Sequence, residues 1–214
     1  MRLFLYWTSG KNPARRRCGL GEAFLSYLIA ALVMAAPGVF ADSFWQGGTS
    51  DFNVAASWNP TGVPAGVNAI NDGGSNNVVR IQPGDPVWSP YDIRAGDGAN
   101  ASGAYLQTGS TNTVNGWFRL GDNAGSSGSY TLSNGVVNAA LQAHVGEAGV
   151  GALTINGGNF NVGQNPFCVG DGDFGAGGSG TVRVTGGTVT TALGLPVAET
   201  VTLISPCETV AVRY

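Results

Sequence analysis

The chain has 214 residues, of which 35 are glycine and only 11% are charged, and its formal net charge is −3. Collagen is excluded because glycine does not occupy every third position. Disorder is disfavoured because apolar residues recur at regular intervals and can form a core. A chain so rich in glycine favours an internal repeat.

The first 41 residues are typical of a secretory signal peptide. Three arginines at positions 15–17 precede an uncharged apolar run over residues 23–41, and Val39 and Ala41 supply the small residues that signal peptidase requires. The alternative is a retained membrane anchor. A proline and a glycine near the end of the run favour cleavage after Ala41, so the sequence predicts a secreted or cell-surface protein with no membrane attachment after cleavage.

Cleavage would change the charge balance of the chain. It would remove five of the ten basic residues and one of the thirteen acids, which leaves five arginines against twelve acids, a net charge of −7. Nucleic acid is a poor partner for such a surface, because binding phosphates requires clustered cations.

Residues 42–100 predict an aromatic-rich N-terminal β cap. The stretch "FWQGGTSDFNVAASWNPTGVPAG" carries Trp45, Phe52 and Trp58 among turn signals, and "NNVVRIQPG" predicts a strand over residues 77–82. A cap of this kind would cover the first edge of a repeat array, which must not remain open.

Residues 101–197 contain a repeat of about 24 residues. Three segments share the order glycine, small, apolar, polar, apolar, polar, turn: "GSYTLSNG" from Gly128, "GALTINGG" from Gly151 and "GTVRVTGG" from Gly180, with a weaker copy, "GAYLQTG", from Gly103. A second element of the repeat ends on glycines spaced by 25, 24 and 24 residues, namely Gly121, Gly146, Gly170 and Gly194.

A unit of this length with short strands and no helix suits one rung of a β-solenoid. Rungs stacked about 4.8 Å apart would bring equivalent residues together in ladders. The predicted inward ladders are Tyr130–Leu153–Val182, Leu132–Ile155–Val184, Val137–Phe160–Val189 and Leu120–Val145–Val169–Leu193. Burial of each such side chain is worth about 1.5–3 kcal/mol. The predicted fold is all-β, a right-handed parallel β-solenoid (β-helix) of about four rungs.

The stretches "SFWQGGTSDFNVAASWNPTGVPAG", "GSYTLSNG", "VGEAGVGALTINGGNFNVG" and "FCVGDG" resemble exported bacterial β-helical repeat proteins of the autotransporter-passenger and PEP-CTERM-associated type. The resemblance covers about residues 43–194. It implies a β-helical passenger displayed at the cell surface or in the extracellular matrix. Residues 198–214 abandon the glycine pattern, so we expect either a capping strand or a truncated chain.

A row of acids directly follows the repeat glycines. Asp122, Glu147 and Asp171 would stack about 5 Å apart, and Asp173 lies two residues beyond the third. Ca²⁺ binds 6–8 oxygen ligands, so one hypothesis is a calcium-binding corner made by these four residues. The competing interpretations are solvated turn carboxylates and, less favoured, a polysaccharide-cleaving site built on Asp122 and Glu147.

The single histidine and two cysteines offer little chemistry. His144 should point outward beside Arg119 and Cys168 of adjacent rungs, as a solvated ladder residue, and the same holds for Cys168. A metal site or catalytic triad would need further partners. One disulfide between Cys168 and Cys207 could form after export.

Four tryptophans could present stacking faces to sugars, although burial in the cap explains them at least as well: Trp45, Trp58, Trp88 and Trp117. The sequence as a whole predicts an exported structural or adhesive repeat protein without a catalytic site or a required cofactor. Extracellular polysaccharide and cell-surface components are its expected partners. The alternative is a polysaccharide-binding module or a fragment of a polysaccharide-degrading β-helix enzyme.

Overall fold

The structure is a computed structural model that describes residues 41–170 and 178–192, together with the backbone of residues 212–213. The predicted signal peptide lies outside the described residues apart from Ala41. So do Asp171, Asp173, Leu193 and Cys207, and the tail apart from one short strand. In the described part of the chain, no helix has the length and apolar character needed to cross a membrane.

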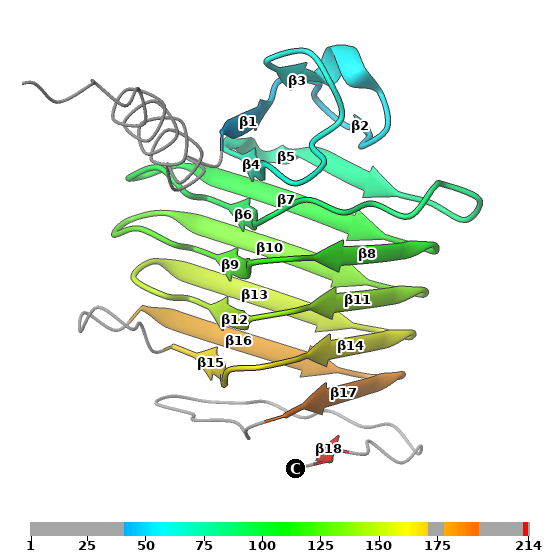
Figure 1. Ribbon diagram of the computed structural model, residues 1–214. Coiled ribbons are helices and arrows are strands. Elements are labelled where there is room, and N and C mark those ends of the chain that lie inside the picture. The colour runs from blue at the N-terminus through cyan, green and yellow to red at the C-terminus, as the bar shows by residue number, and fades with distance from the viewer. Residues whose placement is uncertain (1–40, 171–177, 193–211, 214) are drawn as a thin grey trace, which may run out of the picture. The chain divides into compact units, whose positions relative to one another are not determined.

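The described chain is all-β and winds into a parallel β-solenoid, as predicted (Figure 1). Three sheets form its walls, which we call sheets A, B and C. Sheet A has seven strands in the order β15 (Phe167–Val169), β12 (Gln142–Val145), β9 (Trp117–Leu120), β6 (Ile93–Ala95), β4 (Asn68–Asn71), β1 (Asp42–Trp45) and β3 (Trp58–Asn59). Only β3 runs antiparallel to its neighbour, β1.

Sheet B has six strands in the order β16 (Ser179–Val184), β13 (Val150–Ile155), β10 (Ser127–Leu132), β7 (Ser102–Gln107), β5 (Gly73–Ile81) and β2 (Ser50–Asp51). Sheet C has five strands in the order β18 (Val212–Arg213), β17 (Thr188–Thr191), β14 (Asn159–Val162), β11 (Val136–Ala139) and β8 (Thr111–Val114). The one helical element is the 3-10 turn η1 (Ala55–Ser57). A complete rung runs from sheet B through sheet C to sheet A, as in β10, β11 and β12.

The number of rungs predicted from the sequence was too low. The solenoid has about six turns rather than about four, because β4, β5 and β6 pair in parallel with the strands of the glycine-rich repeat. Trp88 takes the place of a sheet C strand in this early turn, through a bridge to Asn112. The extra rungs lie within residues 42–100, where the sequence carries no glycine repeat to reveal them.

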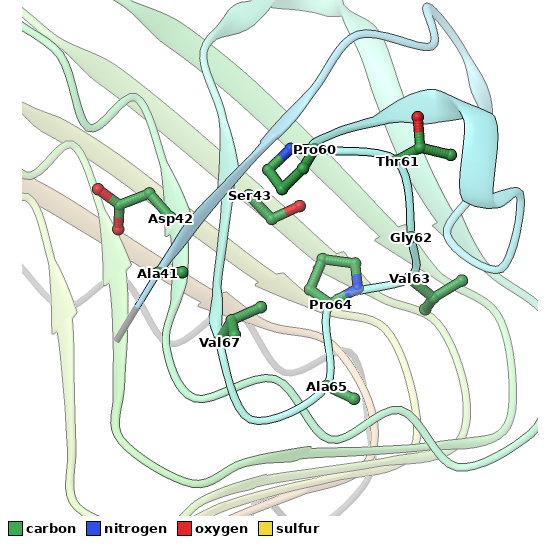
Figure 2. Close-up of a pocket in the computed structure, with 10 residues that line it drawn as sticks. All are labelled: Ala41, Asp42, Ser43, Pro60, Thr61, Gly62, Val63, Pro64, Ala65 and Val67. Atoms are coloured by element: carbon green, nitrogen blue, oxygen red, sulfur yellow. The ribbon is translucent and has the colours of Figure 1, made fainter. Parts of the chain in front are cut away.

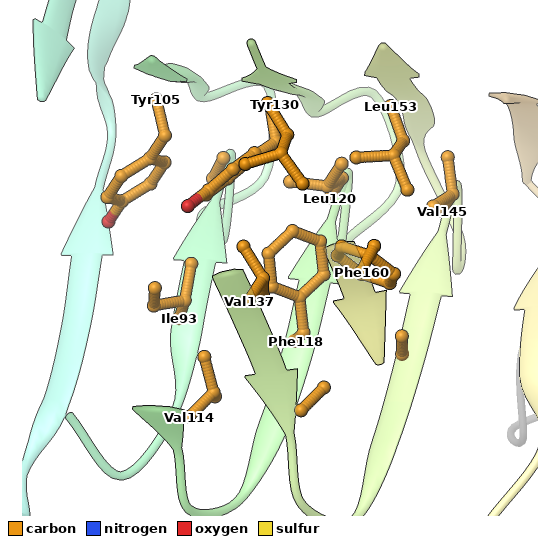
Figure 3. Packing of buried hydrophobic residues seen from close by; sticks show 14 of the residues in the cluster. Ile93, Tyr105, Val114, Phe118, Leu120, Tyr130, Val137, Val145, Leu153 and Phe160 are labelled. Atoms are coloured by element: carbon orange, nitrogen blue, oxygen red, sulfur yellow. The ribbon is translucent and has the colours of Figure 1, made fainter. Parts of the chain in front are cut away.

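The predicted ladders are present in register. Tyr130 pairs with Leu153, which pairs with Val182, and all three are buried. The other described ladders follow the same register: Leu132–Ile155–Val184, Val137–Phe160–Val189 and Leu120–Val145–Val169. Figure 3 shows these side chains meeting in the interior. Alternating burial along each strand explains why one row packs and the next faces outward.

An aromatic column continues the core from the cap into the repeat. Its neighbouring rings lie 4.8–6.3 Å apart between centroids and are joined in the order Phe52, Trp88, Tyr105, Tyr130, Phe118, Phe160 and Phe167. Aromatic pairs at such distances add about 0.5–1.5 kcal/mol beyond their buried area. The cap aromatics are therefore part of one continuous core.

Candidate functional site

Carboxylates line the corner where the chain leaves sheet A. Ala95 pairs with Leu120, which pairs with Val145. The next two positions of each rung are a glycine with positive φ and an acid. Gly121 and Gly146 have φ values of 68° and 77°, a conformation that glycine adopts without strain. The acids are Asp97, Asp122 and Glu147. The structure thus brings the predicted Asp122 and Glu147 together and adds Asp97.

Arginines three residues earlier pair with these acids. Arg94 lies 3.0 Å from Asp97 and 2.8 Å from Asp92. Arg119 lies 3.1 Å from Asp122, and its Nε lies 3.4 Å from Glu147 Oε2. The side chains of Asp122 and Glu147 are only 9% and 3% exposed. Arg119 thus places its positive charge beside both predicted carboxylates.

Two further acids that the repeat did not reveal join adjacent turns. Asp92 is buried, and its Oδ1 accepts a hydrogen bond of 2.7 Å from the Trp117 backbone N–H. Asp72 accepts backbone hydrogen bonds from Asp97 and Gly98 at 2.7 and 3.0 Å. The sequence signal that could have identified Asp97 is "RAGD" over residues 94–97, which matches "RLGD" over residues 119–122.

Proximity and burial perturb the carboxyl groups at this corner. Burial raises the pKa of Asp97 to about 6; a hydrogen bond with Asp122 acts in the same direction, and the Arg94 ion pair opposes both. Burial also raises the pKa of Asp122, to which Glu147 adds through a hydrogen bond, while Asp97 and Arg119 oppose the rise. Neighbouring acids that hydrogen-bond to one another are expected to share protons.

The first expected result is a change in pH dependence in the Asp97→Asn variant. The raised pKa means that the folded state favours protonated Asp97, so its contribution is most favourable below about pH 4 and is lost as the pH rises towards 6. An asparagine can still accept from Arg94 and donate to Asp122. We expect the variant to match wild type at pH 4 and to exceed its unfolding free energy by about 2 kcal/mol at pH 8.

Urea unfolding of both proteins at pH 4, 6 and 8 measures this difference. Asp85→Asn is the control, because Asp85 is an acid of the same kind far along the chain, in the turn after β5. A stability difference between Asp97→Asn and wild type that stays constant from pH 4 to pH 8 would contradict the proton-sharing corner.

The calcium site predicted from Asp122, Glu147, Asp171 and Asp173 stays a prediction. Asp171 and Asp173 lie outside the described residues. Within the described part of the chain, no group of three or more acidic, histidine or cysteine side chains is arranged to hold a metal ion. Asp122 and Glu147 lie together, but the Arg119 guanidinium lies between them and balances their charge.

The predicted solvation of His144 and Cys168 is wrong, although their predicted register is correct. His144 pairs with Arg119 on one side and Cys168 on the other, yet its exposed fraction is 0% and that of Cys168 is 5%. The Trp117 ring stacks on the His144 ring at 6.0 Å. Strand alternation predicts only the direction of a side chain, and large neighbours in the adjacent rung can still cover it. A disulfide from Cys168 to Cys207 stays a prediction.

Three of the four tryptophans are buried, which agrees with the cap interpretation. Trp45, Trp58 and Trp88 are 4% exposed or less. Their indole N–H groups donate to backbone carbonyls at 2.7–2.8 Å. Trp117 is half-buried, and the Arg119 guanidinium lies 3.8 Å from its ring centre. These rings therefore have little free face to offer a sugar.

A pocket of about 210 Å³ lies beside β1 (Figure 2). Its described lining comes from residues 41–43 and from the turn over residues 60–67, with Pro60 and Pro64 among its walls. Asp42 is the one ionisable side chain in that lining, and its Oδ1 accepts a hydrogen bond of 2.8 Å from Asn68. A single paired carboxylate among small apolar groups does not form a catalytic constellation.

Comparison of the chain with protein-family models, with curated proteins and with solved structures gives no match. The resemblance to autotransporter-passenger and PEP-CTERM-associated repeats therefore stays a prediction from the sequence.

Proposed function

We propose that this chain is an exported, non-catalytic repeat protein that acts as a structural and adhesive scaffold at the cell surface or in the extracellular matrix. The observation that carries the proposal is the in-register stacking of rungs, exemplified by Leu153 between Tyr130 and Val182. Such stacking repeats every outward side chain in a fixed row. Extended binding surfaces are the usual use of solenoid architectures.

The arrangement of the polar residues supports a scaffold. The carboxylates of Asp72 and Asp92 bond to backbone N–H groups of the next rung. Arg119 joins Asp122 to Glu147, which belong to successive rungs. These groups connect rungs to one another. The alternative of polysaccharide cleavage needs one carboxyl free to protonate a leaving group and a second to attack or activate water, and both are ion-paired to Arg119 here.

Adhesion by beads coated with the full chain tests the proposal. The beads are passed over a bacterial biofilm under flow, and the retained fraction is counted. We expect wild type and Glu147→Gln to be retained alike, because the carboxylate has a structural role, and Ile155→Asp to be lost because the fold is lost.

Polysaccharide chain length is measured in the same samples. Depolymerisation by wild type that Glu147→Gln abolishes while remaining folded by circular dichroism would overturn the proposal in favour of an enzyme. Folded wild type that is retained no better than beads coated with albumin would also overturn it.

A further inference from the structure

The outer face of sheet C carries a regular array of uncharged polar side chains. In β8, β11, β14 and β17 the first and third residues face outward, since the second and fourth are buried. We call these eight residues the threonine–asparagine face: Thr111, Thr113, Val136, Asn138, Asn159, Asn161, Thr188 and Thr190. All are half-buried or exposed. Figure 1 shows the four strands stacked one after another.

Strand register aligns these side chains in two columns. One column is Thr111–Val136–Asn159–Thr188, and the other is Thr113–Asn138–Asn161–Thr190. Successive members of a column belong to adjacent strands, which lie about 4.8 Å apart. Seven of the eight side chains carry a hydroxyl or an amide. The face therefore presents hydrogen-bonding groups at a constant spacing of one rung.

Hydrogen bonds along the columns hold the side chains in place. Asn161 donates to Asn138 Oδ1 at 2.9 Å, and Thr188 donates to Asn159 Oδ1 at 2.8 Å. Each asparagine amide has two N–H donors and two acceptor sites, so these bonds leave further donors and acceptors directed to solvent. Side chains fixed in this way lose less conformational entropy on binding.

The face differs from the other two walls in charge. The outward positions of β8, β11, β14 and β17 carry no charged residue. The outer face of sheet A carries Arg94 and Arg119 with their acids, and that of sheet B carries Arg80 and Arg183. Without cations, the threonine–asparagine face has nothing to compensate an anionic polymer, so its complement is an uncharged partner rich in hydroxyl groups.

We propose that the threonine–asparagine face binds an extended, uncharged, β-1,4-linked polysaccharide that runs from strand to strand across the rungs. The length of one sugar in such a chain is close to the separation of adjacent strands, so each rung meets an equivalent sugar. This assignment rests on the proposed adhesive function and names its ligand class and its face. The amides and hydroxyls donate to and accept from the sugar hydroxyls.

Affinity on this face arises from repetition. Each rung offers at most two polar side chains, and one hydrogen bond contributes only about 0.5–1.5 kcal/mol. Contacts made by a single chain on successive rungs act together, because the first contact raises the effective concentration for the next. Binding should therefore strengthen with glycan length until the glycan spans the four rungs.

Calorimetry of the full chain with cellohexaose and cellobiose tests the assignment, with polygalacturonate as the charged comparison. We expect cellohexaose to bind at least tenfold more tightly than cellobiose, and polygalacturonate not to bind. The double variant Asn138→Ala/Asn161→Ala should bind cellohexaose about tenfold more weakly, since it loses one amide on each of two adjacent rungs.

Thr131→Ala/Thr154→Ala is the matched control, because these two residues also pair across adjacent rungs but face outward on sheet B. It should bind cellohexaose like wild type. Equal loss in both double variants, stronger binding of polygalacturonate, or no binding of cellohexaose by wild type would overturn the assignment. Inhibition of ice recrystallisation that only the sheet C variant loses, without glycan binding, would assign the face to ice instead. Retention of beads on a biofilm in any of these cases would leave the adhesive function standing.

Discussion

Replacing Ile155 with aspartate is expected to abolish the folded state. Ile155 is fully buried and lies between Leu132 and Val184 in its ladder. An aspartate there would place a carboxylate among aliphatic side chains, far from compensating cations, at a cost of many kcal/mol. That cost is comparable with the roughly 5–15 kcal/mol of stability that whole domains possess. Far-UV circular dichroism and sedimentation should show loss of β structure and aggregation.

The matched control is Thr154→Asp, at the preceding residue of the same strand. Thr154 faces outward, pairs with Thr131 and Arg183 in adjacent rungs, and is half-buried. An added carboxylate beside Arg183 should change the unfolding free energy by no more than about 0.5 kcal/mol. If both variants fold with similar stability, or if both fail, the inward and outward sides of β13 are not those described.

Replacing Gly151 with alanine is expected to destabilise the solenoid by about 3 kcal/mol or more. A Cβ at this position would lie 2.1 Å from the Gly146 backbone N and 2.7 Å from the Leu120 carbonyl oxygen. Both obstacles are backbone atoms held in the ladder of sheet A, so they cannot move without breaking inter-rung hydrogen bonds. The glycine row thus lets the corners of adjacent rungs approach. Urea unfolding measures the loss.

Gly98→Ala controls for the general effect of adding a methyl group to a corner glycine. The nearest atom to a Cβ there is the Asp72 carboxylate oxygen at 3.1 Å, which belongs to a side chain that can rotate. We expect a loss below about 1 kcal/mol, because the contact is relieved by a small movement. Equal destabilisation by Gly98→Ala and Gly151→Ala would show that close backbone approach at Gly151 does not limit the packing.

The repeat predicted the core because spacing determines neighbours in a solenoid. Once Gly128, Gly151 and Gly180 are aligned, each residue after them must meet its equivalent in the next rung. The pairings of Tyr130 with Leu153 and of Phe160 with Val189 follow directly. Even the neighbours of His144 were obtained in this way.

The first rungs could not be predicted because they carry different residues. In β4, β5 and β6 the glycine row is interrupted, and Asn71 performs with its side chain part of what the turn glycines allow elsewhere: its Nδ2 donates to the Asn77 and Ala104 carbonyls at 2.7 and 2.9 Å. Trp88 fills the core where a strand would be expected. Such solutions leave no period in the sequence.

The candidate site was predicted only in part for a similar reason. Spacing placed Asp122 beside Glu147, but the partners that determine their charge state, Arg119 and Asp97, depend on side-chain reach and burial. The threonine–asparagine face required the register of sheet C, because "TNT", "VVN", "NFN" and "TVT" share no letters that align them. Its regularity exists in space more than in sequence.

The most direct measurement of the stacked arrangement is a set of methyl NOEs from Leu153 in protein labelled at leucine, valine and tyrosine. Stacking in register predicts cross-peaks from the Leu153 methyl groups to the Tyr130 ring, 23 residues earlier, and to the Val182 methyl groups, 29 residues later. Cross-peaks to neither residue in a folded sample would contradict the solenoid and every proposal made from its faces.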